Sequence, residues 1–355
     1  VNPPPSSGRL ATHPGGRVTL TNATAINDET ADYWKSNFPA VYLRNGAPQQ
    51  GHSHSDTGNI MLNAYGRYLY PDIKRSWDYL VVKDPETGRQ LNSVRFTKRR
   101  VSHNTVSIDC AEPKHPNQAQ IHDIQRSGPM QLVSVCDKLD PMRRTIGVTE
   151  EYVFDFVRVG KYVESWRDTE HTFDYHLYGL GLPELSGLEN LTSYTTLNEE
   201  YGLGPIDERS SAPDNQWIRP GVSSCTDDTW QAVMREENPE EPEAARGVRI
   251  IMLGGKDTQV ITGDVPARVG RLGWDATREK GGHLSRFGLL MARRRSVNTD
   301  FIVVHQPFMG DDPSPLQVSR KENNIVEVST PAFRDTIELN TMSCKRERAD
   351  KASHT

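Results

Sequence analysis

The 355-residue sequence contains no apolar run approaching the length of about 18 residues that a helix needs to cross a membrane. It also lacks a phosphate-binding loop, a dinucleotide fingerprint, a serine nucleophile elbow and any amphipathic helical pattern of about 12 residues or more. Positive charge is not in excess, because the formal net charge is −5. These absences argue against a membrane-spanning helix, nucleotide chemistry and serine-hydrolase chemistry. The negative net charge also argues against binding of nucleic acid through the electrostatic field of the whole protein.

Cysteine is scarce, with four residues and no Cys-x-x-Cys pair: Cys110, Cys136, Cys225 and Cys344. Four cysteines allow three disulfide pairings, and their spacing does not choose among them. The chain begins at Val1 without a visible signal peptide, so we expect a processed product or a fragment of a longer protein. A charged fraction of 25% is close to that of globular proteins, and this length can bury a large core or hold two domains.

What the sequence does contain is a series of short runs rich in β-branched and aromatic residues, separated by turn signals. Four such runs lie at 131–136, 145–156, 161–167 and 173–178. Two more, at 248–253 and 258–261, flank Gly254 and Gly255 and predict a hairpin. This pattern predicts an all-β protein, a large antiparallel β-sandwich with a smaller C-terminal β segment.

Three candidate metal ligands, His54, Asp72 and His103, each stand at the edge of a strand-like run. Neighbouring antiparallel strands lie about 5 Å apart, so ligands at adjacent strand ends can meet at one ion although they are distant in sequence. Two histidines and one carboxylate suit Zn²⁺ or another divalent first-row metal. A polar strand edge without metal is the alternative interpretation of the His-x-His pattern.

The pattern around these residues resembles a known family. Gly-His-x-His-x-Asp from Gly51, Gly-Arg-x-Leu-x-x-Asp from Gly66 and His-Asn-Thr-Val-x-x-Asp from His103 resemble the C-terminal domain of the heparinase II/III-like polysaccharide lyases. The resemblance is specific over about residues 39–110 and weaker to about 181. A short, faint similarity is also present at 299–307. The spacing of the ligands is most similar to the alginate-lyase branch.

The resemblance implies a lyase that cleaves a uronic-acid polysaccharide by β-elimination, with a mainly structural zinc held by His54, Asp72 and His103. Candidate catalytic residues are then His52, which shares a strand face with His54, and Tyr79. Arg75 and Trp77 are candidates for binding a uronate and stacking on a sugar. Each of these four residues also has a purely structural interpretation. His52 would then be a surface histidine, Tyr79 a core residue, and Arg75 and Trp77 surface and core residues.

The family's lyases are two-part enzymes with an N-terminal helical toroid, for which this sequence has no pattern. Expected partners are therefore an acidic polysaccharide or oligosaccharide and a separate N-terminal helical chain or domain. Homo-oligomerisation stays open, and no nucleic-acid partner is expected. The resemblance implies a secreted or periplasmic location.

The domain organisation that follows is a linker or arm at 1–16, a metal-bearing β-sandwich at 17–181, a continuing β-sandwich with a smaller β region at 182–344 and a charged tail at 345–355. Within the third part, 182–242 is expected to be an excursion with long loops. Several basic residues near the motifs could meet an acidic polymer, and they are Arg67, Lys74, Arg75, Lys98, Arg99 and Arg100.

Three other functions use the same residues. A non-catalytic carbohydrate-binding or structural β protein would keep the metal site without the chemistry. A cupin-like metal oxygenase would use His-x-His with open metal positions, but its glutamate after the second histidine is missing. A zinc hydrolase would need a base beside the metal, for which Asp56 is the near candidate.

Overall fold

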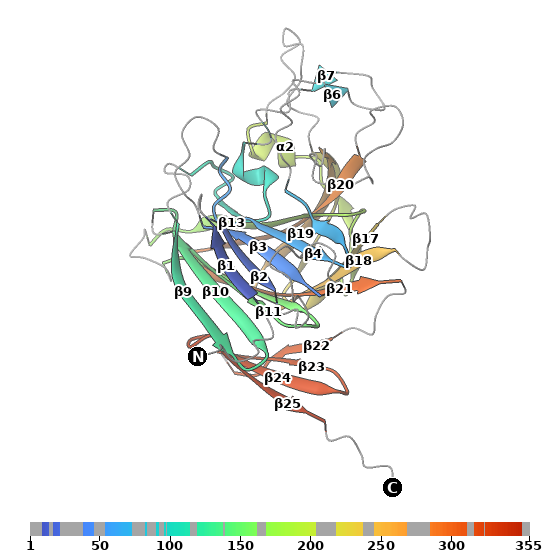
Figure 1. Cartoon of the computed structure of the whole chain (residues 1–355). Coiled ribbons are helices and arrows are strands. Elements are labelled where there is room, and N and C mark those ends of the chain that lie inside the picture. Colours follow the sequence, from blue (N-terminus) through green and yellow to red (C-terminus); the bar gives the residue numbers. More distant parts are fainter. Residues whose placement is uncertain are drawn as a thin grey trace.

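The computed structural model describes residues 9–13, 17–21, 38–45, 54–72, 82–83, 90–91, 96, 98–113, 119–137, 139–161, 168–203, 218–236, 245–267, 285–310, 316–322 and 324–349. Strands dominate this part of the chain, and every strand pair is antiparallel (Figure 1). The helical segments with described bounds are short, namely η2 (Arg100–Ser102) and α2 (Leu197–Glu200). None of the described helices is long and apolar enough to cross a membrane. The predicted all-β class is confirmed.

An eight-stranded sheet forms the middle of the molecule, with strand order β14-β17-β18-β21-β12-β11-β10-β9. Its strands are β9 (Gln120–Ser127), β10 (Met130–Asp137), β11 (Met142–Val148), β12 (Val153–Gly160), β14 (Glu184–Ser186), β17 (Trp230–Arg235), β18 (Arg246–Met252) and β21 (Asn298–Met309). Four strands that precede residue 182 and four that follow it share this sheet, and they join where β12 pairs with β21. The sheet therefore runs across the boundary that the sequence suggested near residue 182.

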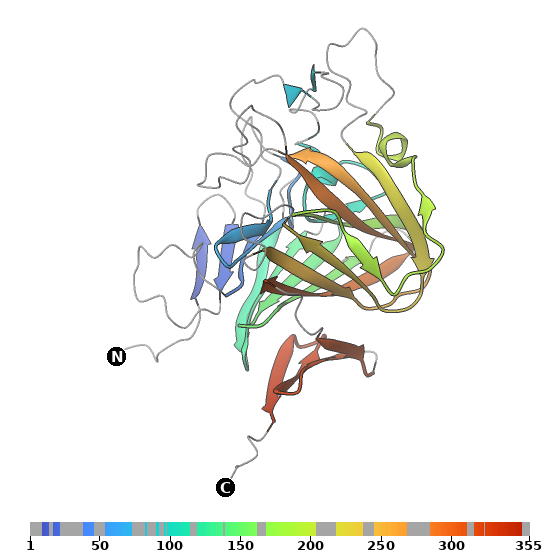
Figure 2. The ribbon, with the colours of Figure 1, turned by 90° about the vertical axis from the view of Figure 1, so that its right-hand side faces the viewer.

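Two further sheets cover one face of the eight-stranded sheet (Figure 2). The six-stranded sheet has the order β15-β16-β19-β20-β13-β8 and the five-stranded sheet the order β1-β2-β3-β4-β5. The strands of the first are β8 (Val106–Ile108), β13 (His171–Gly179), β15 (Thr192–Ser193), β16 (Arg219–Thr226), β19 (Thr258–Ala267) and β20 (Ser285–Ser296). Those of the second are β1 (Arg9–His13), β2 (Arg17–Thr21), β3 (Ala40–Arg44), β4 (Ile60–Ala64) and β5 (Arg67–Tyr70). A small two-stranded sheet joins β6 (Val82–Lys83) to β7 (Gln90–Leu91).

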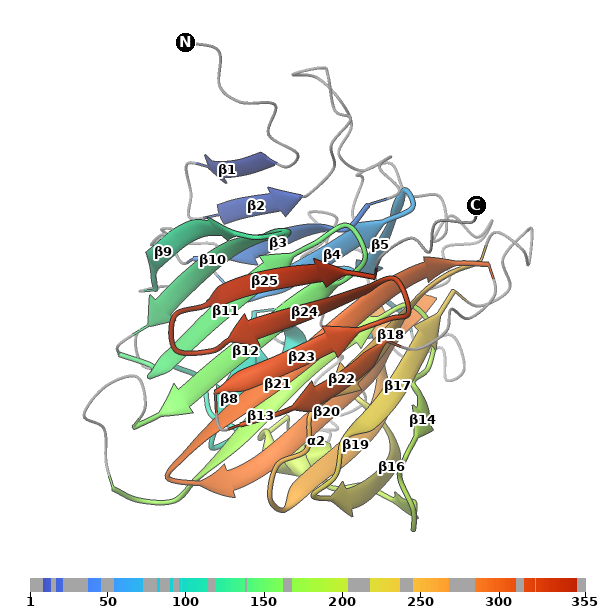
Figure 3. The same ribbon diagram turned by 90° about the horizontal axis from the view of Figure 1, so that it is seen from below.

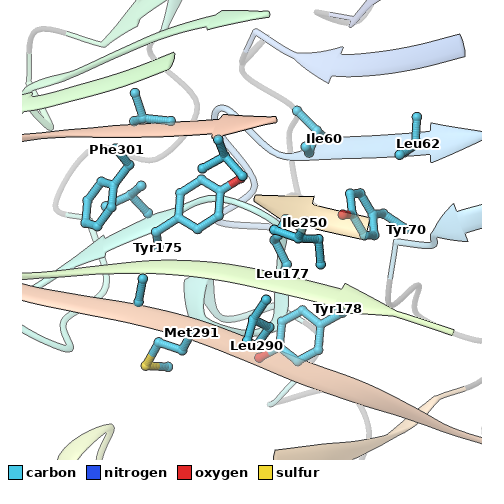
Figure 4. Packing of buried hydrophobic residues seen from close by; sticks show 14 of the residues in the cluster. Ile60, Leu62, Tyr70, Tyr175, Leu177, Tyr178, Ile250, Leu290, Met291 and Phe301 are labelled. Atoms are coloured by element: carbon cyan, nitrogen blue, oxygen red, sulfur yellow. The ribbon is translucent and has the colours of Figure 1, made fainter. Parts of the chain in front are cut away.

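The strict two-residue alternation of strands sends the side chains of the eight-stranded sheet into two separate cores. In β12, Val153 and Val157 point into the core shared with the six- and five-stranded sheets, whereas Phe154 and Phe156 point into the other. Figure 4 shows the first core from close by, with Tyr175 among its apolar side chains. A sheet buried on both faces explains why its strands read as nearly continuous apolar runs.

A four-stranded sheet closes the second core and lies across the eight-stranded sheet (Figure 3). It consists of β22 (Gln317–Arg320), β23 (Ile325–Ser329), β24 (Phe333–Glu338) and β25 (Ser343–Arg348). Val326, Val328 and Ile337 are its inward residues. The buried carboxylate of Asp335 accepts two hydrogen bonds from Arg346, each of 2.7 Å, and one of 2.7 Å from Tyr152 in the turn before β12. This sheet is the smaller C-terminal β segment that the sequence predicted.

The structure differs from the sequence-based expectations at both ends. Strand β1 lies within the predicted linker and pairs with β2 along its whole length. Strand β25 extends to Arg348, inside the predicted charged tail, and Arg346 is fixed there by Asp335 and Glu151. Charged residues on an outer strand thus serve as ion-pair partners instead of marking a frayed end.

The predicted hairpin around Gly254 and Gly255 is wrong. Strand β18 belongs to the eight-stranded sheet and β19 to the six-stranded sheet, so the connection crosses from one layer to the other. A Cβ on Gly254 would lie 2.1 Å from the backbone oxygen of Asp227, and one on Gly255 would lie 2.3 Å from Cζ of Arg294. These glycines permit close approach and not a tight hairpin turn.

Two other sequence-based interpretations also change. The run at 145–156 is two strands, because Thr149 Oγ1 accepts backbone hydrogen bonds from Glu151 and Tyr152 and closes a turn between β11 and β12. The predicted excursion at 182–242 contributes strands to both large sheets. All four cysteines are free thiols.

Candidate functional site

The three predicted metal ligands lie together at the strand ends where the sequence placed them. His54 precedes β4, Asp72 follows β5 by two residues, and His103 follows η2 and precedes β8. His103 Nδ1 lies 2.9 Å from Asp72 Oδ1, and the ring centroids of His54 and His103 are 5.3 Å apart. We call these three residues the histidine–aspartate cluster.

Two asparagines hold the cluster in place. Asn59 donates a hydrogen bond of 3.2 Å to Asp72 and accepts one of 2.8 Å from the backbone amide of Asn104. The buried side chain of Asn104 donates to the carbonyl oxygens of Ile60 and Pro71 and accepts a bond of 2.6 Å from the amide of Tyr178. Asn104 is therefore a structural residue that ties the ends of β4, β5 and β13 to the His103 segment.

Burial and nearby charges set the protonation of the two histidines. Burial lowers the pKa of His54 to about 4, and the charge of His103 acts in the same direction. Burial also acts to lower the pKa of His103, but its hydrogen bond to Asp72 and the charges of Asp72 and Asp56 raise it above the ordinary value. At neutral pH His54 is consequently a neutral imidazole, which is the form that ligates metals.

A second carboxylate, Asp56, completes the surroundings of the cluster. Its Oδ1 lies 3.3 Å from Nε of Arg44, and burial raises the pKa of its carboxyl group. The sequence raised Asp56 only as the base of a hydrolase. Its place beside His103 was not predictable from residue spacing, because the turn from Asp56 to Asn59 sets it.

The donor types of the cluster fit a divalent metal of the zinc class. His103 Nε2 is buried without a hydrogen-bond partner, which is the kind of group that a bound ion would satisfy. In their present conformations, however, no three His, Cys, Asp or Glu side chains within the described ranges are arranged to hold an ion. Asp72 is engaged by Nδ1 of His103.

A fully buried ion pair supports the cluster from the sandwich interior. Arg144 binds Asp155 through two hydrogen bonds of 3.0 and 2.5 Å, and its Nη1 donates to the carbonyl oxygens of Gly58 and Asn104, both at 2.6 Å. Gly58 and Asn104 belong to the segments that carry His54 and His103. The buried guanidinium therefore fixes these two segments relative to β11.

Three more buried polar groups surround this ion pair. The hydroxyl of Tyr175 donates a bond of 2.6 Å to Asp155, and His305 Nε2 lies 3.6 Å from the same carboxylate. The other ring nitrogen of His305 is 2.9 Å from the hydroxyl of Tyr70. Burial acts to raise the pKa of Asp155, but Arg144 and His305 outweigh it and hold this pKa at about 2. Asp155 is therefore a carboxylate at neutral pH.

The other predicted site residues do not enter this description. His52, Tyr79, Arg75 and Trp77 lie outside the described residues. Their roles stay predictions.

Of the predicted basic surface, Lys74 and Arg75 lie outside the described residues, and three of the four others make internal contacts. Arg100 is buried and pairs with Asp140 at 2.5 Å, Arg99 pairs with Glu112 at 3.1 Å, and Arg67 lies 3.6 Å from Glu236. Arg100 is thus a core residue and cannot meet a polymer. Lys98 remains near the cluster, where its charge helps to lower the pKa of His54.

Comparison of the sequence with family models and with curated proteins gives no match. Comparison of the fold with solved structures does. A heparinase III with methylated lysines aligns with a TM-score of 0.56 at 11% identity, over 98% of this chain and 42% of that chain. The heparan sulfate lyase of Pedobacter heparinus aligns with a TM-score of 0.56 at 10% identity, over 96% and 42%.

The fold is that of the heparinase-like polysaccharide lyases. A further heparinase III structure agrees, with a TM-score of 0.53 at 15% identity over 97% of this chain and 42% of that chain. The match falls on the β-sandwich part of the heparinases, and the chain spans less than half of their length. The predicted all-β class and the resemblance to the heparinase-like lyases are thereby confirmed, and the similarity to the alginate-lyase branch stays a prediction.

Proposed function

We propose that the chain is the β portion of a polysaccharide lyase that cleaves a uronic-acid polysaccharide by β-elimination. The observation that carries this proposal is the heparinase-like fold over nearly the whole chain, combined with the convergence of His54, Asp72 and His103 at its strand ends. The substrate class follows from the lyase reaction and from the names of the structural relatives. A secreted or periplasmic location is part of the proposal.

The reaction sets three requirements. A base removes the proton at C5 of the uronate, the bond between C4 and O4 breaks as the C4–C5 double bond forms, and an acid protonates the departing oxygen. The uronate carboxylate must be neutralised so that the C5 proton becomes acidic. We assign proton transfer to His52 and Tyr79, carboxylate binding to Arg75 and sugar stacking to Trp77.

We assign the histidine–aspartate cluster a structural zinc. Bound zinc would fix the segments before β4 and β8 to the segment after β5, which adjoin in sequence the residues assigned to the substrate. Zinc binding requires Asp72 to exchange its hydrogen bond with His103 for the ion. The buried, unpartnered Nε2 of His103 and the neutral imidazole of His54 support this assignment.

Zinc content after chelation and reconstitution tests the metal site, measured by mass spectrometry. We expect one zinc per chain in the wild type and its loss in H54A and D72A. H171A is the matched control, because His171 forms a similar histidine–aspartate bond of 2.7 Å with Asp109 at the other end of β8. Equal zinc in D72A and H171A would refute the site.

The unsaturated uronate product absorbs in the ultraviolet, which gives a direct assay on alginate, heparan sulfate, chondroitin and glucuronan. We expect a rise on one of them, abolished in H52A and Y79F with zinc retained. The assay is run with the chain alone and with a helical lyase domain added as a separate chain. Product formed equally by wild type, H52A and Y79F would contradict the assigned roles.

A non-catalytic carbohydrate-binding protein is the second candidate, favoured by the observation that the histidine–aspartate cluster is held by internal hydrogen bonds, as in a structural site. It predicts saturable binding of one of these polymers without any unsaturated product, whether or not a helical domain is added.

A further inference from the structure

The connection between β14 and β15 contains a motif that the proposed function does not use. It reads Asn190-Leu191-Thr192, and its threonine is the first residue of β15. An asparagine followed two positions later by threonine, without proline between them, is the acceptor sequence for N-linked glycosylation. Because so short a motif also occurs by chance, its place in the fold decides whether it can act.

The fold leaves this motif open to a modifying enzyme. All three residues are exposed, and the apolar side chain of Leu191 is 48% exposed. Asn190 has a φ of 54°, a left-handed conformation that asparagine adopts more readily than most other residues. The motif therefore lies on a surface connection, which is where N-linked glycans occur.

A polar groove adjoins Asn190 on the side of β16 and β19. Its volume is about 910 Å³, at the upper end of the range of about 300–1,000 Å³ that small-molecule sites span. Asn190 and Thr192 line one side of it, and Ser223, Thr226 and Gln259 contribute hydroxyl and amide groups from the two strands. Strands β14 and β16 both lie at one edge of the molecule (Figure 3).

The charges of the groove suit a neutral sugar. No lysine or arginine is among the described residues that line it, whereas Glu189 and Asp228 contribute carboxylates. These carboxylates would repel a uronate polymer, but they can accept hydrogen bonds from sugar hydroxyl groups. The groove is therefore distinct in chemistry from a site for the proposed substrate.

We propose that Asn190 is a site of N-linked glycosylation and that the first, neutral sugar of the glycan lies in this groove. The amide nitrogen of Asn190 attacks C1 of an oligosaccharide that is carried on a lipid diphosphate, which a transferase of the secretory compartment supplies. The bond from C1 to the phosphate oxygen breaks as the C1–N bond forms. The lipid diphosphate leaves with the electron pair, and the amide nitrogen gives up one proton.

The position also gives the glycan a physical role. β15 is an edge strand of the six-stranded sheet, and an exposed edge can pair with a strand of another chain. A bulky hydrophilic glycan two residues before β15 would block such pairing and cover the exposed Leu191. The proposal rests on the secreted location within the proposed function, and it does not depend on lyase chemistry.

Secretion of the full chain from a eukaryotic host, behind a signal sequence of that host, tests the site. Enzymatic release of the glycan in heavy-oxygen water converts the modified asparagine to labelled aspartate, which peptide mapping by mass spectrometry locates. We expect the label at Asn190 in the wild type and in T192S, which keeps the hydroxyl group. N190Q and T192A should lack it. Unmodified Asn190 in the secreted wild type would overturn the site.

The rate of glycan release from the folded protein tests the groove. A sugar held in the groove is protected, so Q259L, which removes a hydrogen-bonding side chain from the lining, should speed release about twofold to tenfold. Q317L is the matched control, because Gln317 is an exposed glutamine on β22 outside the groove. Equal release rates in the wild type, Q259L and Q317L would overturn the placement of the sugar.

Two comparisons separate this proposal from the proposed function. D72A should lose zinc and keep the glycan at Asn190, so failure of the metal site would leave the glycosylation site unaffected. We expect the same glycan on the protein from its natural source. An unmodified Asn190 there, together with a modified one in the secreting host, would overturn the secreted location and with it the modification.

Discussion

Replacing Asp155 by asparagine is the sharpest test of how the sandwich interior supports the candidate site. The change removes one negative charge and keeps the size of the side chain. Arg144 cannot leave its place, because its Nη1 also binds the carbonyl oxygens of Gly58 and Asn104. D155N therefore leaves a fully buried guanidinium without its counter-charge.

The size of the effect follows from burial. Arg144 and Asp155 are both 0% exposed, and breaking a buried ion pair by removing one partner costs about 3–5 kcal/mol. The lost bond from Tyr175 lies on the same carboxylate and adds in the same direction. We therefore expect D155N to lower the free energy of unfolding in urea by about 3–5 kcal/mol.

The pH dependence gives an independent estimate. Arg144 and His305 overcome the effect of burial and depress the pKa of Asp155 from 3.8 to about 2 in the folded chain. A depressed carboxyl pKa stabilises the fold above the unfolded value and loses that contribution as pH falls through the folded value. The shift corresponds to about 2–3 kcal/mol. The stability difference between wild type and D155N should therefore narrow between about pH 4 and pH 2.

The double variant R144M/D155L is the control. It removes both charges but leaves the carbonyl of Gly58 without its donor, which costs about 1–3 kcal/mol, so it should be more stable than D155N. A loss below about 1 kcal/mol in D155N, or a double variant as unstable as the sum of R144M and D155L, would refute this reasoning.

Three further predictions concern other parts of the fold. N104A removes three buried hydrogen bonds and should lower the urea midpoint by the equivalent of about 2–4 kcal/mol; an unchanged midpoint would contradict its structural role. G58A places a Cβ 2.5 Å from Cε of Met142 at a φ of +71°, costing about 1–2 kcal/mol in thermal unfolding; in an M142A background, which removes the clash, the added cost of G58A should be smaller. D335N removes one of the two carboxylates that hold Arg346 and weakens the bond from Tyr152, so limited proteolysis should cut the four-stranded sheet before the sandwich.

The sequence predicted the fold class because alternation and turn signals are local. The sequence-based prediction of strand boundaries was wrong where a side chain, and not glycine or proline, forms the turn. Thr149 closes the turn between β11 and β12 through its hydroxyl group, and an apolar run continues on both sides of it. The two glycines Gly254 and Gly255 also misled, because they are typical of a hairpin turn. Here they are needed for close packing against Asp227 and Arg294, and the neighbouring sequence does not reveal that long-range contact.

The candidate site was predictable to the extent that its ligands adjoin strands. Asp72 and His103 lie close to strands β5 and β8, and His54 lies in the turn segment before β4. The pairing of β4 with β5 brings two of these segments together, whereas β8 belongs to another sheet, and the hydrogen bonds of Asn104 join the His103 segment to them. The residues that hold them were not predictable in this way. Arg144 reaches the carbonyl of Gly58 from 86 positions away, and no local pattern distinguishes it from the other arginines of the chain.

These long-range contacts also explain why an ion pair, and not an apolar pair, occupies the centre of the sandwich beneath the cluster. Apolar residues at Arg144 and Asp155 would fill the same space at a smaller loss of stability than breaking the pair would cause. They would offer no donor to the carbonyl oxygens of Gly58 and Asn104, the two points where the His54 and His103 segments meet β11. The charge of Asp155 thus serves to keep a guanidinium buried, and the guanidinium serves to align two loops. Stability and site geometry therefore depend on the same two residues. The double variant R144M/D155L separates the two properties, because it should keep most of the stability and lose the alignment of the His54 and His103 segments.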